Sequence, residues 1–215
     1  MRGRLLGLLA LAVSIGCLFF WTGWSQGPLV AFLGDSLTSG WKLPPDQAYP
    51  ARAQRALRER GRPIRVLNAG VSGDTVAQGG ERLEGVLQLR PDVLVVALGI
   101  NDGLRGLPLA AVETNLRDIV SRARGRGVHV LLAGMRIPPG RDPEYARRFG
   151  EIYERLAADY RLPLVPFLLE GVAGRPEMTF PEGLHPSAVG QERVATNLLP
   201  HLELLLAEVR AGKRP

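Results

Sequence analysis

The chain has 215 residues, a hydrophobic share of 46% and a formal net charge of +6 at pH 7. This length fits one domain with a sizeable core, and the composition excludes an intrinsically disordered chain. Nearly all of the positive charge is arginine, and the arginines are interspersed with acidic residues rather than gathered in a run. Nucleic-acid-binding proteins usually concentrate basic residues on one element and often add aromatic stacking platforms. We therefore expect no nucleic-acid partner, and we interpret the arginines as parts of solvated helix faces.

The first residues differ in character from the rest of the chain. Arg2 and Arg4 precede an apolar run from Leu5 to Trp21, which is the order found in a secretory signal. The run is long for a signal peptide and lacks a convincing cleavage site, which favours an uncleaved membrane anchor over a cleaved signal. The two arginines predict a cytoplasmic N-terminus. We therefore divide the chain into a signal or anchor segment, 1–27, and an exported domain, 28–215. The domain would be periplasmic or lie at the outer face of the cytoplasmic membrane, anchored or released.

The single cysteine, Cys17, lies within this apolar segment. Its surroundings resemble a lipoprotein processing site only weakly, because the usual leucine is missing. The domain from residue 28 onward therefore has no disulfide, no thiol nucleophile and no cysteine metal ligand. Since the sequence also shows no metal-binding cluster and no phosphate-binding glycine loop, we expect no metal and no cofactor.

Short apolar runs alternate with longer amphipathic stretches from residue 29 onward. Each run is rich in valine and leucine and bounded by glycine, proline or asparagine, which is typical of strands buried on both faces. The predicted strands are Leu29–Leu33, Ile64–Leu67, Asp92–Leu98, Val128–Ala133 and Leu162–Phe167.

The amphipathic stretches predict helices between these strands. They are Ala48–Arg60, Val76–Leu89, Leu109–Arg124 and Pro143–Tyr160, and a last helix from about Ser187 to about Arg210. Pro200 should kink or break the last helix. The alternation predicts a single three-layer α/β/α domain around a parallel five-stranded sheet. In such a sheet the ligand site lies beyond the carboxyl ends of the strands.

Small and polar residues follow three of the predicted strands. The blocks are Gly34-Asp35-Ser36-Leu37, Asn68 to Asp74 with Gly73 inside it, and Gly99-Ile100-Asn101-Asp102, and His185-Pro186 precedes the last helix. In this order the four blocks resemble those of the SGNH (GDSL) hydrolases over the whole exported domain. The stretches 72–75 and 101–106 are similar, more narrowly, to the bacterial periplasmic thioesterase, arylesterase and lysophospholipase group. The resemblance implies a flavodoxin-like SGNH hydrolase fold and a serine hydrolase.

The same resemblance implies that Ser36 is the nucleophile and that His185 is the base that takes its proton. The alternative for Ser36 is a helix N-cap, a common role for serine. His129, at the start of an apolar strand, and His201, on the last helix, are poorer candidates for the base. The family usually has an aspartate three residues before the histidine, and this chain has Glu182, which is longer by one methylene. We expect Glu182 to orient His185, and the alternative is a loop carboxylate in solvent.

An oxyanion formed during acyl transfer needs hydrogen-bond donors that are already in place. The resemblance assigns this role to the backbone N–H of Ser36, the backbone N–H of Gly73 and the side-chain amide of Asn101. Gly73 could equally be an ordinary turn glycine. We expect Asp35 and Asp102 to be structural, bonding loop amides around the site.

Several apolar residues fall in the strand-exit loops and could either line an acyl groove or close the core over the sheet. They are Ile100, Leu104, Leu107, Met135, Ile137, Pro138 and Phe180. The segment Gly103–Pro108 looks like the loop that adjusts to the acyl chain in the thioesterase group.

Taken together, these features predict a monomeric serine esterase for small-molecule carboxylic esters or thioesters, acting through an acyl-enzyme on Ser36. The resemblance implies an arylesterase, acyl-CoA thioesterase or lysophospholipase, and the N-terminal segment allows membrane association. Two alternatives stay open. One is a carbohydrate O-deacetylase on the same fold, and the other is a catalytically silent, membrane-tethered binding module.

Overall fold

A computed structural model of the chain describes residues 27–137 and 142–215. Apart from Gly27, the predicted signal or anchor segment lies outside these ranges. Within them, no helix combines the length and the apolar character needed to cross a bilayer.

Five parallel strands form one sheet in the order β2-β1-β3-β4-β5. They are β1 (Leu29–Gly34), β2 (Arg65–Gly70), β3 (Val93–Ala97), β4 (His129–Ala133) and β5 (Leu164–Val165). Gly34 at the end of β1 pairs with Gly70 of β2 and with Ala97 of β3. Three neighbouring strands therefore end together at what we call the carboxyl edge, and the opposite side, where all five strands begin, is the amino edge.

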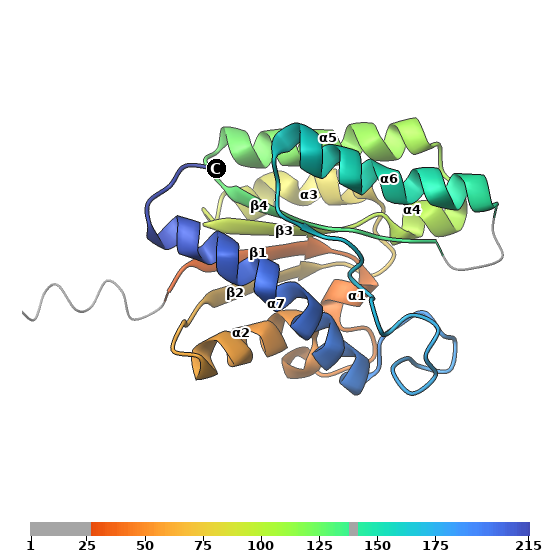
Figure 1. Ribbon diagram of the computed structural model, residues 1–215, viewed down its shortest axis with the longest axis horizontal. Coiled ribbons are helices and arrows are strands. Elements are labelled where there is room, and N and C mark those ends of the chain that lie inside the picture. The colour runs from red at the N-terminus through yellow and green to blue at the C-terminus, as the bar shows by residue number, and fades with distance from the viewer. Residues whose placement is uncertain (1–26, 138–141) are drawn as a thin grey trace, which may run out of the picture.

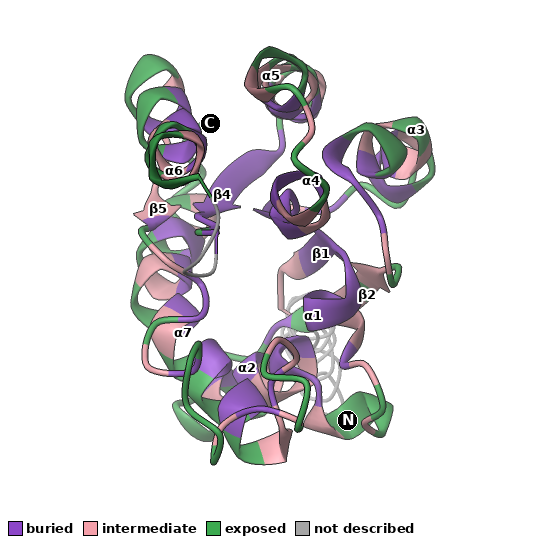
Figure 2. Cartoon of the chain, turned by 90° about the vertical axis from the view of Figure 1, so that its right-hand side faces the viewer, coloured by how far each residue is buried: buried purple, intermediate pink, exposed green. Residues whose placement is uncertain are grey.

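Five long helices cover the two faces of the sheet (Figure 1). One face carries α2 (Tyr49–Glu59) and α7 (Ala188–Arg210), and the other carries α3 (Val76–Leu87), α5 (Leu109–Gly125) and α6 (Pro143–Tyr160). Their buried residues face the sheet (Figure 2), and one continuous core runs from Val30 to Leu206. The predicted three-layer α/β/α fold is confirmed.

Two predictions about the strands are wrong. The residues of β2 are exposed or half-buried rather than buried on both faces, because among the described strands β2 lies at the edge of the sheet, next to β1. The last strand is limited to β5, since only Leu164 and Val165 pair with β4. After them the chain turns back over the sheet, and the N–H of Leu168 donates to the carbonyl of Gly134.

Pro200 does not break the last helix, which continues through it from Ala188 to Arg210. Proline removes one N–H and leaves the carbonyl four residues earlier without its helical partner. That residue is Thr196, and both Thr196 and Pro200 are exposed. Water can therefore satisfy the carbonyl, and the helix tolerates the proline.

Three short elements lie outside the predicted helix and strand ranges. They are α1 (Ser36–Ser39), the 3-10 turn η1 (Pro45–Gln47) and α4 (Ile100–Arg105). Ile100 and Leu104 are therefore helical, and only the second part of the predicted loop Gly103–Pro108 is irregular.

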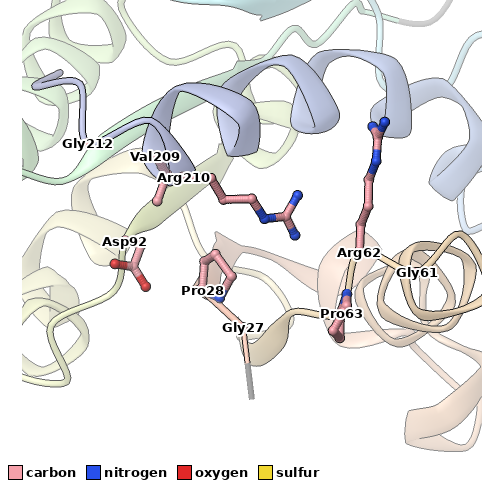
Figure 3. A pocket seen from close by; sticks show the side chains of 9 residues that line it. All are labelled: Gly27, Pro28, Gly61, Arg62, Pro63, Asp92, Val209, Arg210 and Gly212. Carbon is pink, nitrogen blue, oxygen red and sulfur yellow. The ribbon is translucent and has the colours of Figure 1, made fainter. Parts of the chain in front are cut away.

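The chain enters the described domain at the amino edge. Gly27 and Pro28 lie there beside Pro63, which precedes β2, and Asp92, which precedes β3. Together with Arg210 and other residues at the end of α7, they line a pocket of 610 Å³ (Figure 3). This pocket is at the opposite end of the strands from the three polar strand exits.

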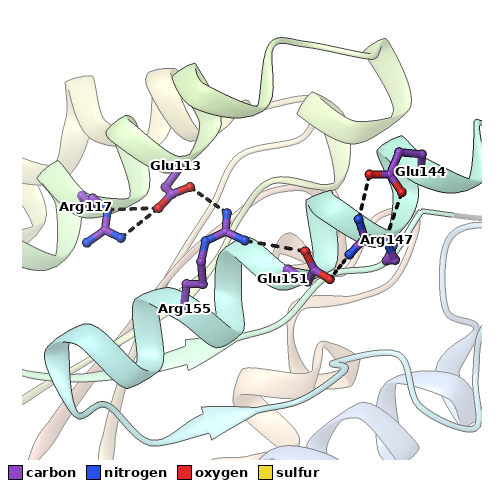
Figure 4. A network of polar contacts seen from close by, with 6 residues as sticks. All are labelled: Glu113, Arg117, Glu144, Arg147, Glu151 and Arg155. Carbon is purple, nitrogen blue, oxygen red and sulfur yellow. Dashed lines mark hydrogen bonds and ion pairs between the residues drawn. The ribbon is translucent and has the colours of Figure 1, made fainter.

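A chain of ion pairs connects α5 to α6 on the molecular surface (Figure 4). Its members are Glu113, Arg117, Glu144, Arg147, Glu151 and Arg155. Arginines on helix faces that alternate with acidic partners agree with our interpretation of the composition. Exposed pairs of this kind contribute little stability each, about 0–1 kcal/mol.

Candidate active site

Ser36 follows β1 after one residue, Asp35, and is the first residue of α1, not its N-cap. The N-cap is Asp35, whose carboxylate accepts a hydrogen bond of 2.9 Å from the N–H of Leu37. The hydroxyl of Ser36 is therefore not used in capping, and the N-cap interpretation of this serine is wrong. Ser36 is 7% exposed. Its neighbours therefore restrict the side chain, and a small part of the residue stays accessible to solvent.

The three residues predicted to form a triad are in hydrogen-bond contact. The distance from Ser36 Oγ to His185 Nε2 is 2.9 Å, and that from His185 Nδ1 to Glu182 Oε1 is 3.0 Å. These are the two contacts that a nucleophile, a base and an orienting acid require. The glutamate therefore reaches the imidazole despite its extra methylene.

The loop that carries the acid and the base is fixed by its own backbone. Phe180 N–H donates to the carbonyl of His185 at 2.9 Å, and Gly183 N–H donates to the carbonyl of Phe180 at 2.8 Å. Gly183 has φ +76°, which glycine adopts readily. A β-bridge between Thr179 and Pro186 closes the loop. Glu182 and His185 are thus held at opposite ends of a tight turn.

The Glu182 side chain is 38% exposed, whereas that of His185 is 15% exposed. Desolvation opposes ionisation of Glu182. Hydrogen bonds from its own backbone and from His185 outweigh that effect and lower the pKa of its carboxyl. The acid is therefore ionised near neutral pH, as an orienting carboxylate must be.

An aromatic side chain that the sequence did not single out completes the environment of the histidine. The Trp41 indole stacks on His185 with ring centroids 4.1 Å apart, and Phe180 packs edge-on against Trp41 at 5.9 Å. Lys42 places its ammonium 4.0 Å from the centre of the same indole. The available signal was an aromatic residue in the loop after the nucleophile, but its partner is 144 positions away and only the fold brings them together.

The predicted oxyanion donors lie at the three neighbouring strand exits. Gly73 has φ +86°, and its backbone is open on the side where a Cβ would be, with only Arg105 Nη2 nearby at 3.9 Å. Within the described part of the chain, neither the N–H of Ser36 nor that of Gly73 donates a hydrogen bond. The Asn101 amide donates one hydrogen to the carbonyl of Asp74 at 2.9 Å, which leaves its second hydrogen available.

Side chains of α3 and of two strand exits tie these loops together. Arg82 donates to the Asp74 carboxylate at 2.6 Å and to the carbonyl of Gly34 at 2.8 Å. The carboxylate of Asp102 accepts a hydrogen bond of 3.0 Å from the N–H of Val76. The predicted structural role of Asp102 is confirmed, as is that of Asp35, which caps α1.

Asp35 is a fully buried carboxyl with one unsatisfied oxygen. Its Oδ2 has no hydrogen-bond partner in the described structure. Burial raises its pKa to about 7, the hydrogen bond from Leu37 opposes this, and the charge of Asp74 adds to it. Burial likewise raises the pKa of Asp102. The raised pKa values of Asp35 and Asp102 mean that the buried side of the site carries less negative charge than two fully ionised aspartates would give.

The apolar residues predicted to line an acyl groove separate into two groups. Ile100, Met135 and Ile137 are buried members of the core, which is the alternative that the sequence left open for them. Leu104, Leu107 and Phe180 are half-buried, so part of each side chain still faces outward. Pro138 lies outside the described residues.

The other two histidines lie away from the triad. His129 begins β4, is 6% exposed and forms a hydrogen bond with the carbonyl of Lys213 at 3.0 Å. His201 is half-buried on α7. Among the residues that the structure describes, no group of three or more histidine, cysteine or acidic side chains is placed to hold a metal ion.

Comparisons with known proteins agree with this geometry. Residues 32–193 match the model of the GDSL-like Lipase/Acylhydrolase family. The chain is 40% identical over 175 residues to Esterase TesA of Pseudomonas aeruginosa, which covers 81% of this chain and 87% of that protein. It is 34% identical to Thioesterase 1/protease 1/lysophospholipase L1 of Escherichia coli K12, with 81% and 83% covered.

A solved structure repeats the fold. The crystal structure of TesA superposes with a TM-score of 0.80 at 39% identity and covers 82% of this chain and 99% of that one. The strand order, the four sequence blocks and these matches lead to one assignment. The chain belongs to the GDSL-like lipase/acylhydrolase family, the SGNH hydrolases.

Proposed function

We propose that this chain is a serine esterase that hydrolyses carboxylic esters and thioesters through an acyl-enzyme on Ser36. The observation that carries the proposal is the continuous contact from Ser36 Oγ through His185 to Glu182. A binding module that had lost catalysis would have no need to keep these three groups in line. The names of the relatives, an esterase and a thioesterase with lysophospholipase activity, support the same class of substrate.

In the first half of the reaction, Ser36 Oγ attacks the carbonyl carbon and its proton passes to His185 Nε2. Glu182 holds the imidazole and stabilises its positive charge. The carbonyl oxygen becomes an oxyanion beside the N–H groups of Ser36 and Gly73 and the amide of Asn101. When the tetrahedral species collapses, the alcohol or thiol leaves with the proton from His185 and the acyl group stays on Ser36.

In the second half, water attacks the acyl-enzyme. His185 takes a proton from the water, the same donors stabilise the new oxyanion, and the acid is released as Ser36 recovers its proton. Because α1 is a single turn of four residues, we assign the stabilisation to the individual N–H donors rather than to a helix dipole.

For the acyl chain, we propose a shallow groove formed by the half-buried Leu104, Leu107 and Phe180. All three expose part of an apolar side chain, and Leu104 lies one turn after the oxyanion donor Asn101 on α4. Such a groove would favour medium-length acyl groups over acetate. A carbohydrate O-deacetylase would show the opposite preference, so a series of p-nitrophenyl esters of increasing length, with one acyl-CoA thioester, separates the two.

The catalytic assignment is tested with a fluorophosphonate probe and mass spectrometry. The folded protein should acquire one adduct on Ser36, and Ser36→Ala should lose both the adduct and turnover while its unfolding temperature changes little. Unchanged ester hydrolysis by Ser36→Ala would exclude the serine. A protein that is folded but neither labelled nor active would support the binding module.

We further propose that residues 1–27 export the domain 28–215 and keep it at the outer face of the cytoplasmic membrane. The support is the sequence alone, with Arg2 and Arg4 before an apolar run of bilayer-spanning length. Cell fractionation and the mass of the mature N-terminus would distinguish an anchored chain from one released by cleavage.

A further inference from the structure

Arginines that are scattered along the sequence gather at the amino edge of the sheet. Each long helix runs antiparallel to the strands, so its C-terminal end lies at the amino edge. The last turns of α2, α5 and α7 carry Arg58, Arg124 and Arg210, and Arg161 caps α6. Cations are favourable at helix C-termini, and the topology places all these ends on one side of the molecule.

Two pockets at this edge are lined by three of these side chains, Arg124, Arg161 and Arg210. The pocket of Figure 3 lies at the amino ends of β2, β1 and β3, and Arg62 and Arg210 are among the residues that line it. A second pocket of 510 Å³ lies at the amino ends of β4 and β5, and its lining includes Arg124, Arg161 and Arg214. The C-terminal end of α7 contributes to both pockets, so they adjoin.

The positive charge of this surface is only partly offset within the described domain, where Asp92, Asp159 and Glu208 line the same two pockets. Seven basic residues there form no ion pair with another described residue, and we call them the amino-edge basic face: Arg65, Arg90, Arg124, Arg161, Arg210, Lys213 and Arg214. By contrast, Arg60 and Arg62 at the same edge both pair with Glu203.

Stabilisation of helix ends accounts for only part of this face. Arg65 is the first residue of β2, and Arg214 lies beyond the end of α7. Neither belongs to the last turn of a helix, and both are exposed. Leu89, beside Arg90, is 56% exposed and is among the few large apolar side chains that stand in solvent. An apolar residue among unpaired cations fits a partner whose surface is anionic and whose interior is apolar.

We propose that the amino-edge basic face docks on an anionic phospholipid bilayer. Three observations point to a bilayer. The cations are unpaired, an apolar side chain stands among them, and Gly27 opens the described chain at this same edge. The 26 residues before Gly27 include the apolar run of residues 5–21, which is long enough to enter a bilayer. The catalytic residues lie at the opposite edge, so docking leaves them uncovered.

The test uses residues 27–215. All core residues lie between Val30 and Leu206, and the crystallised TesA chain corresponds to this domain over 99% of its length, so the fragment contains a complete fold. We expect it to cosediment with vesicles of phosphatidylglycerol and phosphatidylcholine, to bind weakly to pure phosphatidylcholine, and to dissociate as salt is added.

Charge reversal at the face should abolish this binding. Each basic residue near an anionic surface contributes roughly five-fold to partitioning, so the triple variant R65E/R90E/R214E should bind at least about a hundred-fold more weakly. The matched control R55E/R148E/R175E changes three exposed arginines elsewhere and should bind nearly as the parent does. Circular dichroism and hydrolysis of a soluble p-nitrophenyl ester, expected to be unchanged in both variants, verify the fold.

Three results would overturn the proposal. Equal binding to pure phosphatidylcholine would remove the electrostatic basis. An equal loss in both triple variants would show that only the net charge matters. Tighter binding to duplex DNA than to the vesicles, at the same phosphate concentration, would show that the face recognises a different polyanion.

Discussion

The indole of Trp41 and the imidazole of His185 stack with an interplanar angle of 26°. His185 is thereby held on three sides, by Ser36 at Nε2, by Glu182 at Nδ1 and by the aromatic face. Because Glu182 is partly exposed, its hydrogen bond competes with water and fixes the ring less firmly than a buried one would. The stack supplies a constraint that water cannot replace.

Removing the stack should therefore lower kcat more than it raises KM. Aromatic pairs contribute about 0.5–1.5 kcal/mol beyond their burial, so Trp41→Ala should reduce kcat up to about ten-fold. Trp41→Phe keeps a ring in place and should recover most of the rate. Steady-state kinetics on one soluble ester measure both. Equal kcat values for the alanine and phenylalanine variants would mean that the ring does not position His185.

The glutamate behind the histidine gives a second prediction. Glu182→Gln keeps the length but loses the charge that stabilises the imidazolium, and should reduce kcat by on the order of a thousand-fold. Glu182→Asp keeps the charge but is shorter, in a loop that places a glutamate. Its kcat should lie between those of the parent and Glu182→Gln. If Glu182→Gln is nearly as active as the parent, His185 depends on another group.

The side-chain amide of Asn101, which also donates to the carbonyl of Asp74, gives a third prediction. Asn101→Ala removes one oxyanion donor and should reduce kcat by about a hundred- to a thousand-fold with little change in KM. Asn115→Ala on α5 removes an amide far from the site and is the matched control. A rise in KM with kcat preserved would place Asn101 in substrate binding instead.

The buried carboxyl of Asp35 should make stability depend on pH. Its pKa is raised to about 7 in the folded state, from 3.8 in the unfolded state. The folded protein therefore binds a proton that the unfolded chain has lost, and stability decreases as the pH rises through that interval. Asp35→Asn can keep the cap on α1 without a titrating group.

Urea unfolding of both proteins at pH 5 and pH 8 measures this effect. The stability of Asp35→Asn relative to the parent should increase by on the order of 3 kcal/mol from the lower pH to the higher one. Comparison with the parent cancels the other titrating groups. A stability difference that is the same at both pH values would show that Asp35 is ionised in the folded protein throughout.

The long helices were predictable because they depend on local patterns, whereas the catalytic residues were predicted from the resemblance of four sequence blocks to the SGNH hydrolases. Pro143–Tyr160 was predicted with the bounds that the structure has, since proline opens the helix and its apolar residues recur at helical spacing. The short helices α1 and α4 were not among the predicted helix ranges, because four to six residues carry no clear periodicity. The stack of Trp41 on His185 and the gathering of arginines at the amino edge depend on which chain ends the topology brings together, and sequence distance hides both.

Strand β1 begins two residues after Gly27 and ends two residues before Ser36. At about 3.3 Å per residue, its six residues form a rigid spacer of about 20 Å. A chain held through the segment before Gly27 therefore presents its nucleophile at a fixed height, facing away from the surface that holds it. Lipids in that surface cannot reach Ser36 without leaving their leaflet. Esters dissolved in the aqueous phase, or offered by an opposing membrane, arrive from the open side.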